Sequence, residues 1–130
     1  MFEKINLFVN WFESDYNYIG DYVNDDDSHD YKRARGFNYH NGPEWLWLTG
    51  YYIRAKLFWA KKQDDPIIIK RTMKHLKTIL TYHIELLNSS VWKGLPELTN
   101  VDGRPCPYSC NVQAWSAATL IEALHDLNRF

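Results

Sequence analysis

The feature that most constrains this fold is a short break between two long helical stretches, at residues 64–66. Asp65 can cap a helix with its carboxylate, and Pro66 suits the first helical position. Before the break, residues 43–62 begin with Pro43 and Glu44 and are apolar around almost the whole circumference, which predicts a helix buried on most sides. After it, residues 66–87 carry one apolar stripe: Ile69, Met73, Leu76, Leu80, His83 and Leu87.

A third long helix is predicted at residues 111–128, with Ser109 as its cap. Its small side chains allow a neighbouring helix to approach closely: Ala114, Ala117, Ala118 and Ala123. Near the amino end, residues 2–12 have the apolar spacing of a short helix. A length of 130 residues suits one domain. The sequence therefore predicts a single all-α domain over residues 1–130.

Charge and composition argue against several kinds of partner. A net charge of −1 gives no reason to expect nucleic acid or a membrane surface. The four basic residues of the second helix are interpreted as a solvated face: Lys70, Arg71, Lys74 and Lys77. No signal peptide or membrane anchor is evident after Met1, so a cytoplasmic location is the default. Cys106 and Cys110 are interpreted as structural thiols, and neither a metal nor a cofactor is predicted.

Residues 21–30 contain five aspartates and are predicted to form a loop, because dense like charges repel and Asp favours turns. Acidic and polar residues at alternate positions raise the alternative of a calcium loop: Asn24, Asp26, Ser28 and Asp30. However, His29 stands where such a loop has glycine, and Arg35 stands where it has a bidentate glutamate. A solvated acidic loop is therefore favoured.

Residues 92–110 form an irregular segment between helices, punctuated by Gly and Pro. Glu97 lies in its middle, after Pro96. A single loop glutamate is usually a solvated surface charge, but this one has aromatic and polar neighbours that suit a sugar site: Trp92, Asn100, Asp102 and Trp115. For the tryptophans Trp45, Trp47, Trp59 and Trp115, a purely structural role in the core remains the alternative.

Three motifs are recognisable together. They are YHNGPEWLW at residues 39–47, WKGLPELTN at residues 92–100, and CPYSC at residues 106–110 followed by QAWS at residues 113–116. In this order and spacing they resemble the C-terminal region of eukaryotic glycogen debranching enzymes. That region is the amylo-α-1,6-glucosidase part of a bifunctional enzyme that also carries a 4-α-glucanotransferase. The resemblance covers residues 15–127, whereas residues 1–14 match poorly.

The resemblance implies the C-terminal part of an (α/α)6 toroid, the six-hairpin glycosidase type, with a glucose site in the loops at one end. It implies inverting hydrolysis with Glu97 as the general base. The site would be lined by His40, Glu44, Trp45, Trp92, Gln113 and Trp115. No stretch here matches the part of the family that carries the general acid. The implied partners are glycogen or limit dextrin and the rest of the barrel, in cis or in trans. The alternative is a non-catalytic homologue that binds glycogen or another chain.

Overall fold

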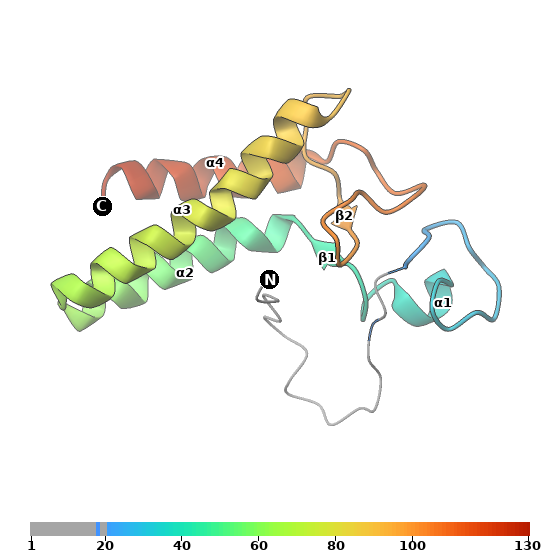
Figure 1. The fold of residues 1–130 in the computed structure, drawn as a ribbon, viewed down its shortest axis with the longest axis horizontal. Helices are drawn as coiled ribbons and strands as arrows, with labels where there is room; N and C mark the ends of the chain where they lie inside the picture. Colours follow the sequence, from blue (N-terminus) through green and yellow to red (C-terminus); the bar gives the residue numbers. More distant parts are fainter. Residues whose placement is uncertain (1–17, 19–20) are drawn as a thin grey trace.

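A computed structural model describes Tyr18 and residues 21–130, so the predicted short helix at residues 2–12 lies outside the described residues. The described part is mainly helical, as predicted (Figure 1). Its helices are α1 (Arg35–Asn38), α2 (Trp47–Gln63), α3 (Pro66–Ser89) and α4 (Ala114–Asn128). The prediction missed a small antiparallel ribbon, in which β1 (Glu44–Trp45) pairs with β2 (Leu98–Thr99).

The predicted break between the first two long helices is confirmed. Asp64 ends α2 in the left-handed conformation, with φ of 48°. The Asp65 carboxylate then accepts a hydrogen bond of 2.8 Å from the backbone N–H of Ile67, and Pro66 opens α3. Because Pro66 has no N–H to leave unpaired, it fits the first turn without cost. The chain therefore reverses within a few residues and α3 folds back along α2 (Figure 1).

Two predicted helix starts are wrong. The helix expected from Pro43 begins at Trp47, because Glu44 and Trp45 are extended and pair with Thr99 and Leu98. Glu44 therefore does not lie in the first turn of a helix.

The helix expected from residue 111 begins at Ala114. Ser109 does not cap it, because its hydroxyl donates a 2.8 Å hydrogen bond to the carbonyl of Cys106 and so closes a turn within the preceding loop.

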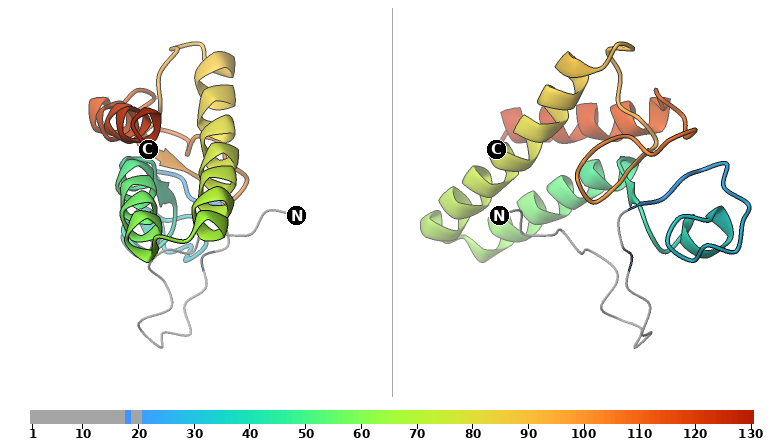
Figure 2. Two further views of the ribbon diagram at one scale, coloured as in Figure 1. Left: turned by 90° about the vertical axis from the view of Figure 1, so that its left-hand side faces the viewer. Right: turned by 45° about the vertical axis from the view of Figure 1, so that its right-hand side comes forward.

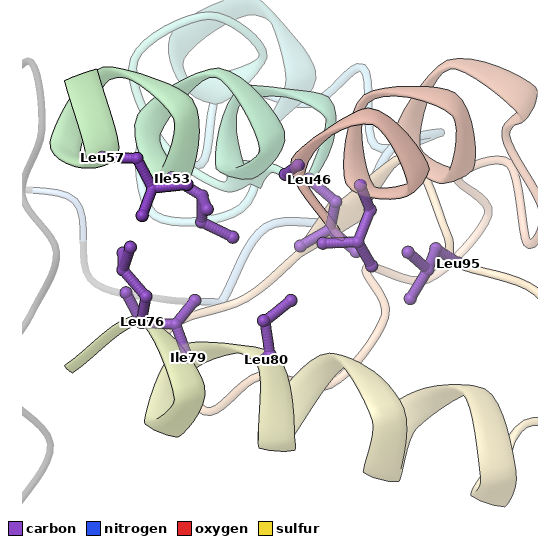
Figure 3. Close-up of a cluster of buried hydrophobic side chains, with 9 residues drawn as sticks. Leu46, Ile53, Leu57, Leu76, Ile79, Leu80 and Leu95 are labelled. Carbon is purple, nitrogen blue, oxygen red and sulfur yellow. The ribbon is translucent and has the colours of Figure 1, made fainter. Parts of the chain in front are cut away.

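The main core lies where the three long helices meet. Figure 3 shows Leu76, Ile79 and Leu80 of α3 pointing toward Ile53 and Leu57 of α2. Leu120 and Ala123 of α4 complete the cluster, together with Leu46 and Leu95 from the loops. Fully burying a leucine or isoleucine side chain contributes about 1.5–3 kcal/mol, so this cluster is the principal source of stability for the helices.

Helices α2 and α4 approach each other unusually closely. A Cβ placed on Gly50 would lie 2.2 Å from the carbonyl oxygen of Thr119, so only glycine fits. The Thr119 hydroxyl donates a 2.8 Å hydrogen bond to the carbonyl of Trp47. Further along, Arg54 pairs with Glu122 at 2.6 Å. Trp47 contacts Thr119, and the later residue Arg54 contacts the later residue Glu122, so α2 and α4 run in the same direction. Helix α3 runs opposite to both (Figures 1 and 2).

The expectation that α2 is buried on most sides is wrong for this chain. Its side chains Tyr51, Phe58 and Trp59 are 47%, 54% and 63% exposed. The physical reason is that α3 and α4 cover one side of α2, while nothing among the described residues covers the other. Within Tyr18 and residues 21–130, no helix has the length and apolar character needed to cross a bilayer.

We expect Gly50→Ala to destabilise the fold by about 2–3 kcal/mol, because the added methyl group meets backbone atoms of Thr119. Helix propensity alone would give the opposite sign, since alanine is about 1 kcal/mol better than glycine within a helix. Thermal unfolding followed by circular dichroism measures the change. The control is Gly36→Ala, where nothing lies within 4 Å of the new methyl group. Equal melting temperatures for both variants would contradict the close approach.

Candidate active site

Glu97 lies between two separate clusters of buried side chains. Leu95, two residues before it, belongs to the main helical core. Leu98, directly after it, is completely buried in a second cluster with Tyr22 and Cys106. Partly buried aromatic rings pack against this second cluster: Tyr18, Tyr39 and Trp45. The segment that carries the carboxylate is thus anchored in apolar packing on both sides.

The backbone around Glu97 is equally well fixed. The carbonyls of Leu95, Glu97 and Leu98 accept hydrogen bonds of 2.8–3.1 Å from backbone N–H groups, namely those of Gln113, Leu46 and Cys106. The N–H of Glu97 donates to the carbonyl of Cys110 at 2.9 Å. A buried polar backbone group without a partner is costly, so these bonds strongly favour one path of the chain. The irregular loop is therefore rigid at the point where Glu97 projects.

The Glu97 side chain is half-buried and oriented by Gln113. The Gln113 amide nitrogen donates to Glu97 Oε1 at 3.2 Å. The hydroxyl of Ser116, which is fully buried, lies 3.0 Å from Gln113 Oε1 and 3.0 Å from the carbonyl of Pro96. A hydroxyl beside Gln113 Oε1 places the amide nitrogen toward Glu97. The structure thus brings Gln113 to Glu97 through a chain of side-chain hydrogen bonds.

Strand β1 brings Glu44 and Trp45 beside the Glu97 segment. Glu44 is the cross-strand partner of Thr99, and Trp45 is the partner of Leu98. Desolvation by the surrounding protein raises the pKa of the Glu44 carboxyl above its usual value, although its side chain still reaches solvent. Glu44 and Trp45 therefore pair with the two residues that directly follow Glu97.

The ring of Trp45 forms one side of the candidate site together with Tyr39 and His40. The Trp45 indole N–H donates to the carbonyl of Tyr39 at 3.3 Å. Its ring meets that of Tyr39 edge to face, with centroids 5.1 Å apart, and lies parallel to the exposed His40 ring, with centroids 6.4 Å apart. His40 and Trp45 are thus brought together next to β2.

The remaining predicted aromatic residues separate into different environments. Trp115, in the first turn of α4, stacks on Trp47 with centroids 4.1 Å apart and planes 10° apart. Tyr51 meets Trp47 edge to face, with centroids 5.9 Å apart, so an aromatic row begins near Gln113. Trp92 lies in an exposed turn after α3, with 66% of its surface accessible, and makes no ring contact among the described residues. For Trp59, which is 63% exposed, the interpretation as a core residue is wrong in this chain.

The acidic loop is held by its own hydrogen bonds. Three side-chain oxygens accept hydrogen bonds of 2.9–3.1 Å from the backbone N–H groups two residues later. Asp26 Oδ1 accepts from Ser28, Ser28 Oγ accepts from Asp30, and Asp30 Oδ1 accepts from Lys32. The loop prediction is confirmed, and these side chains cap local turns. No group of three or more His, Cys, Asp or Glu side chains in Tyr18 and residues 21–130 is arranged to hold a metal.

Other residues near the loop have structural roles. Asn100, which the sequence grouped with Glu97, instead accepts from the N–H of Tyr22 at 3.0 Å and donates to its carbonyl at 3.2 Å, so it ties down the start of the acidic loop. Asp102 pairs with Arg104. Burial raises the pKa of the Cys106 thiol to about 12, which suits an inert structural cysteine. Cys110 is exposed and is also unpaired, so the described cysteines form no disulfide.

Sequence reasoning missed Ser116 and Tyr39 as parts of this site. The role of Ser116 could have been predicted from the sequence, because it follows Gln113 by about one helical turn and therefore lies on the same face at the start of α4. The role of Tyr39 could not have been predicted from the sequence, because it contributes a backbone carbonyl and a ring edge whose positions depend on the path of the acidic loop.

A protein-family model described as amylo-alpha-1,6-glucosidase matches residues 12–122. The chain belongs to this family. The glycogen debranching enzyme of Saccharomyces cerevisiae (strain ATCC 204508 / S288c) is 40% identical over 125 residues, which cover 88% of this chain. The resemblance drawn from the three motifs is therefore confirmed. The chain spans 8% of the length of that curated relative.

We expect Ser116→Ala to lower the free energy of unfolding by about 1–2 kcal/mol, because it leaves a buried carbonyl of Pro96 or the amide oxygen of Gln113 without its donor. Urea unfolding of the purified chain measures this. Ser89→Ala is the matched control, since the exposed Ser89 hydroxyl also bonds a backbone carbonyl but its removal exposes nothing buried. Similar losses in the two variants would argue against a special role for Ser116.

We expect Glu44→Gln to stabilise the chain at pH 7 and to have less effect near pH 4. A carboxyl whose pKa is raised in the folded state binds more protons there than in the unfolded state, so stability falls as pH rises through the interval above its ordinary pKa. Denaturant unfolding at the two pH values measures the difference. Glu85→Gln, at an exposed position of α3, controls for the loss of one negative charge. The same change in both variants at both pH values would contradict desolvation of Glu44.

Proposed function

We propose that this chain provides the base-bearing part of an α-1,6-glucosidase site that hydrolyses the single α-1,6-linked glucose left at a trimmed glycogen branch. The observation that carries the proposal is the half-buried Glu97, held by Gln113 on a rigid loop whose next residue, Leu98, lies in the cluster against which the ring of Trp45 packs. Aromatic faces beside a fixed carboxylate suit a pyranose ring, which has apolar C–H faces and a hydroxyl rim. Membership of the amylo-α-1,6-glucosidase family supports the same reaction.

In this proposal Glu97 is the general base of an inverting hydrolysis. Glu97 takes a proton from a water molecule while the water oxygen attacks C1 of the glucose. A second carboxylic acid on the opposite face protonates the leaving O6 as its bond to C1 breaks. The products are β-glucose and the shortened glucan. Gln113 holds one carboxylate oxygen of Glu97, which leaves the other oxygen to position the water.

The arrangement of helices supports the proposal that the chain is part of an (α/α)6 toroid. In a ring of helical hairpins, successive helices alternate in direction, and those of one layer run parallel. Helices α2 and α4 run in the same direction with α3 against them, as such a ring requires (Figure 2). The ribbon and the loop that carries Glu97 both lie at the end of the bundle where α2 and α4 begin, which is where loops of one end would form a shared site (Figure 1).

The general acid is proposed to come from another part of the glucosidase, in cis or in trans. The chain spans 8% of its yeast relative, and the exposed rings of Tyr51, Phe58 and Trp59 mark a face of α2 that further helices of a toroid would cover. An exposed apolar surface of this kind is typical of a partner interface. Glycogen or limit dextrin is the proposed substrate, and no cofactor is proposed.

We expect glucose release from phosphorylase limit dextrin when this chain is co-expressed with a yeast debranching enzyme that lacks the matching region. Glu97→Gln should lower the initial rate of release by about 10²–10⁴-fold, which is the usual contribution of a general base. Glu85→Gln, in the exposed part of α3, is the matched control and should retain the full rate. Circular dichroism of each variant verifies that the fold is intact.

A Glu97→Gln complex that releases glucose as fast as the parent would exclude Glu97 as the base. Absence of release from the parent complex would instead favour a second function, glycogen binding without turnover. The observation in favour of that alternative is the exposed aromatic surface, because Trp115 is 49% and Trp92 is 66% accessible without any catalytic role being assigned to either. Glycogen co-sedimentation of the chain alone distinguishes the two outcomes.

A further inference from the structure

A surface cavity of about 640 Å³ lies beside the candidate active site, on the side of the acidic loop. Its walls come from the acidic loop and from the residues around α1: Asn24, Asp27, Arg35, Gly36, Phe37, Tyr39, His40 and Asn41. This volume lies within the range of about 300–1,000 Å³ that is usual for small-molecule sites. The mechanism proposed for Glu97 uses none of the charged groups in this cavity.

The walls of the cavity are fixed before any ligand binds. The N–H of Arg35 donates to the carbonyl of Asp26 at 2.7 Å, and the N–H of Val23 donates to the carbonyl of Arg33 at 3.1 Å, so the ends of the loop are tied together. The side-chain amide of the fully buried Asn38 donates to the carbonyls of Tyr31 and Ala34 at 3.0 and 2.9 Å. A preformed wall matters for affinity, because a ligand then does not have to order the loop.

The chemistry of the cavity suits a neutral ligand with many hydroxyl groups. The carboxylate of Asp27 and the guanidinium of Arg35 form an ion pair of 2.9 Å, so their charges cancel. Side by side they present acceptors and donors, and adjacent hydroxyls of a sugar can both donate and accept hydrogen bonds. The ring of Phe37 is 44% exposed and supplies an apolar face for the C–H groups of a pyranose.

Tyr39 and His40 connect the lining of this cavity with Trp45 of the candidate active site. Both residues line the cavity, and both rings contact or lie parallel to Trp45, the cross-strand partner of Leu98 next to Glu97. A glucan bound to Glu97 by its α-1,6-linked glucose must carry the rest of its chain away from that residue. The cavity offers such a path, because Tyr39 in its wall packs against the cluster that contains Leu98.

We propose that this cavity is a binding site for an α-1,4-linked glucan chain, the portion of the substrate that remains after the branch glucose is removed. The proposal rests on the proposed function for the identity of the ligand, whereas the site itself rests on the cavity. Binding energy from a remote part of a substrate can position the scissile bond. The paired Asp27 and Arg35 would bond the hydroxyl rim, and Phe37 would support one sugar ring.

We expect maltotetraose to bind the 130-residue chain in the millimolar range, measured by perturbation of backbone amide signals in heteronuclear NMR. Phe37→Ala should weaken this binding about tenfold, which corresponds to the loss of a typical aromatic contact. The matched control is Tyr31→Ala, because Tyr31 is an exposed aromatic residue of the same loop that does not line the cavity. Asp27→Asn combined with Arg35→Gln, at exposed positions, should weaken binding without altering the fold.

Equal binding by the parent and by Phe37→Ala, or no binding of maltotetraose by the parent at millimolar concentration, would overturn this site. Shifts confined to the region around Trp115, with none from Asn24 to Asn41, would also overturn it. These outcomes are independent of the proposed hydrolysis, which is tested by the rate of glucose release from Glu97→Gln. Loss of release in that variant with maltotetraose binding retained would support both proposals, because Glu97 lies outside the cavity.

Discussion

The double anchoring of residues 95–98 is the constraint on which the rest of the candidate site depends. Leu95 is packed into the helical core and Leu98 into the cluster under the acidic loop, so the residue between them cannot move independently of either. The backbone carbonyls of these residues accept hydrogen bonds from the start of α4, the loop after β2 and the start of α2. The carboxylate of Glu97 is therefore positioned by elements that are far apart in the sequence. Catalytic groups on loops need rigid support of this kind, since small displacements of a general base are costly.

The contact between α2 and α4 supplies the second part of that support. Gly50 lets the backbone of α4 approach at Thr119, and this approach sets the position of the whole first turn of α4. Trp115 then stacks on Trp47, and Gln113 and Ser116 reach the Glu97 segment. The ion pairs of Arg54 with Glu122 and Asp126 lie further along the same interface. They are partly exposed and add about 0–1 kcal/mol each, so close packing rather than charge holds the two helices in register.

Local sequence signals predicted the parts of the fold that depend on neighbouring residues. Asp65 and Pro66 determined the helix break because a cap and a first-turn proline act within one turn. The starts of α2 and α4 could not be found in this way. Glu44 and Trp45 leave the helix in order to pair with β2, which is more than fifty residues away, and Ser109 bonds within its own loop. For the site, the motifs named Glu97, Gln113, His40 and Trp45, and the structure brings Gln113 to Glu97 and His40 to Trp45. The support from Ser116 and Tyr39 depends on tertiary contacts.

In the inverting hydrolysis proposed here, the two catalytic carboxyl groups can come from different segments of chain. The two carboxyls of an inverting glycosidase stand on opposite faces of the sugar, about 6.5–9.5 Å apart, with room for a water molecule between the base and the substrate. Neither carboxyl therefore needs contact with the other to be held in place. Glu97 is positioned by contacts within this chain, through Leu46, Cys110, Gln113 and the two clusters of buried residues. Under the proposed mechanism, Glu97 would be preformed in this segment and completed by an acid from another, and the exposed face of α2 is the proposed surface between the two segments.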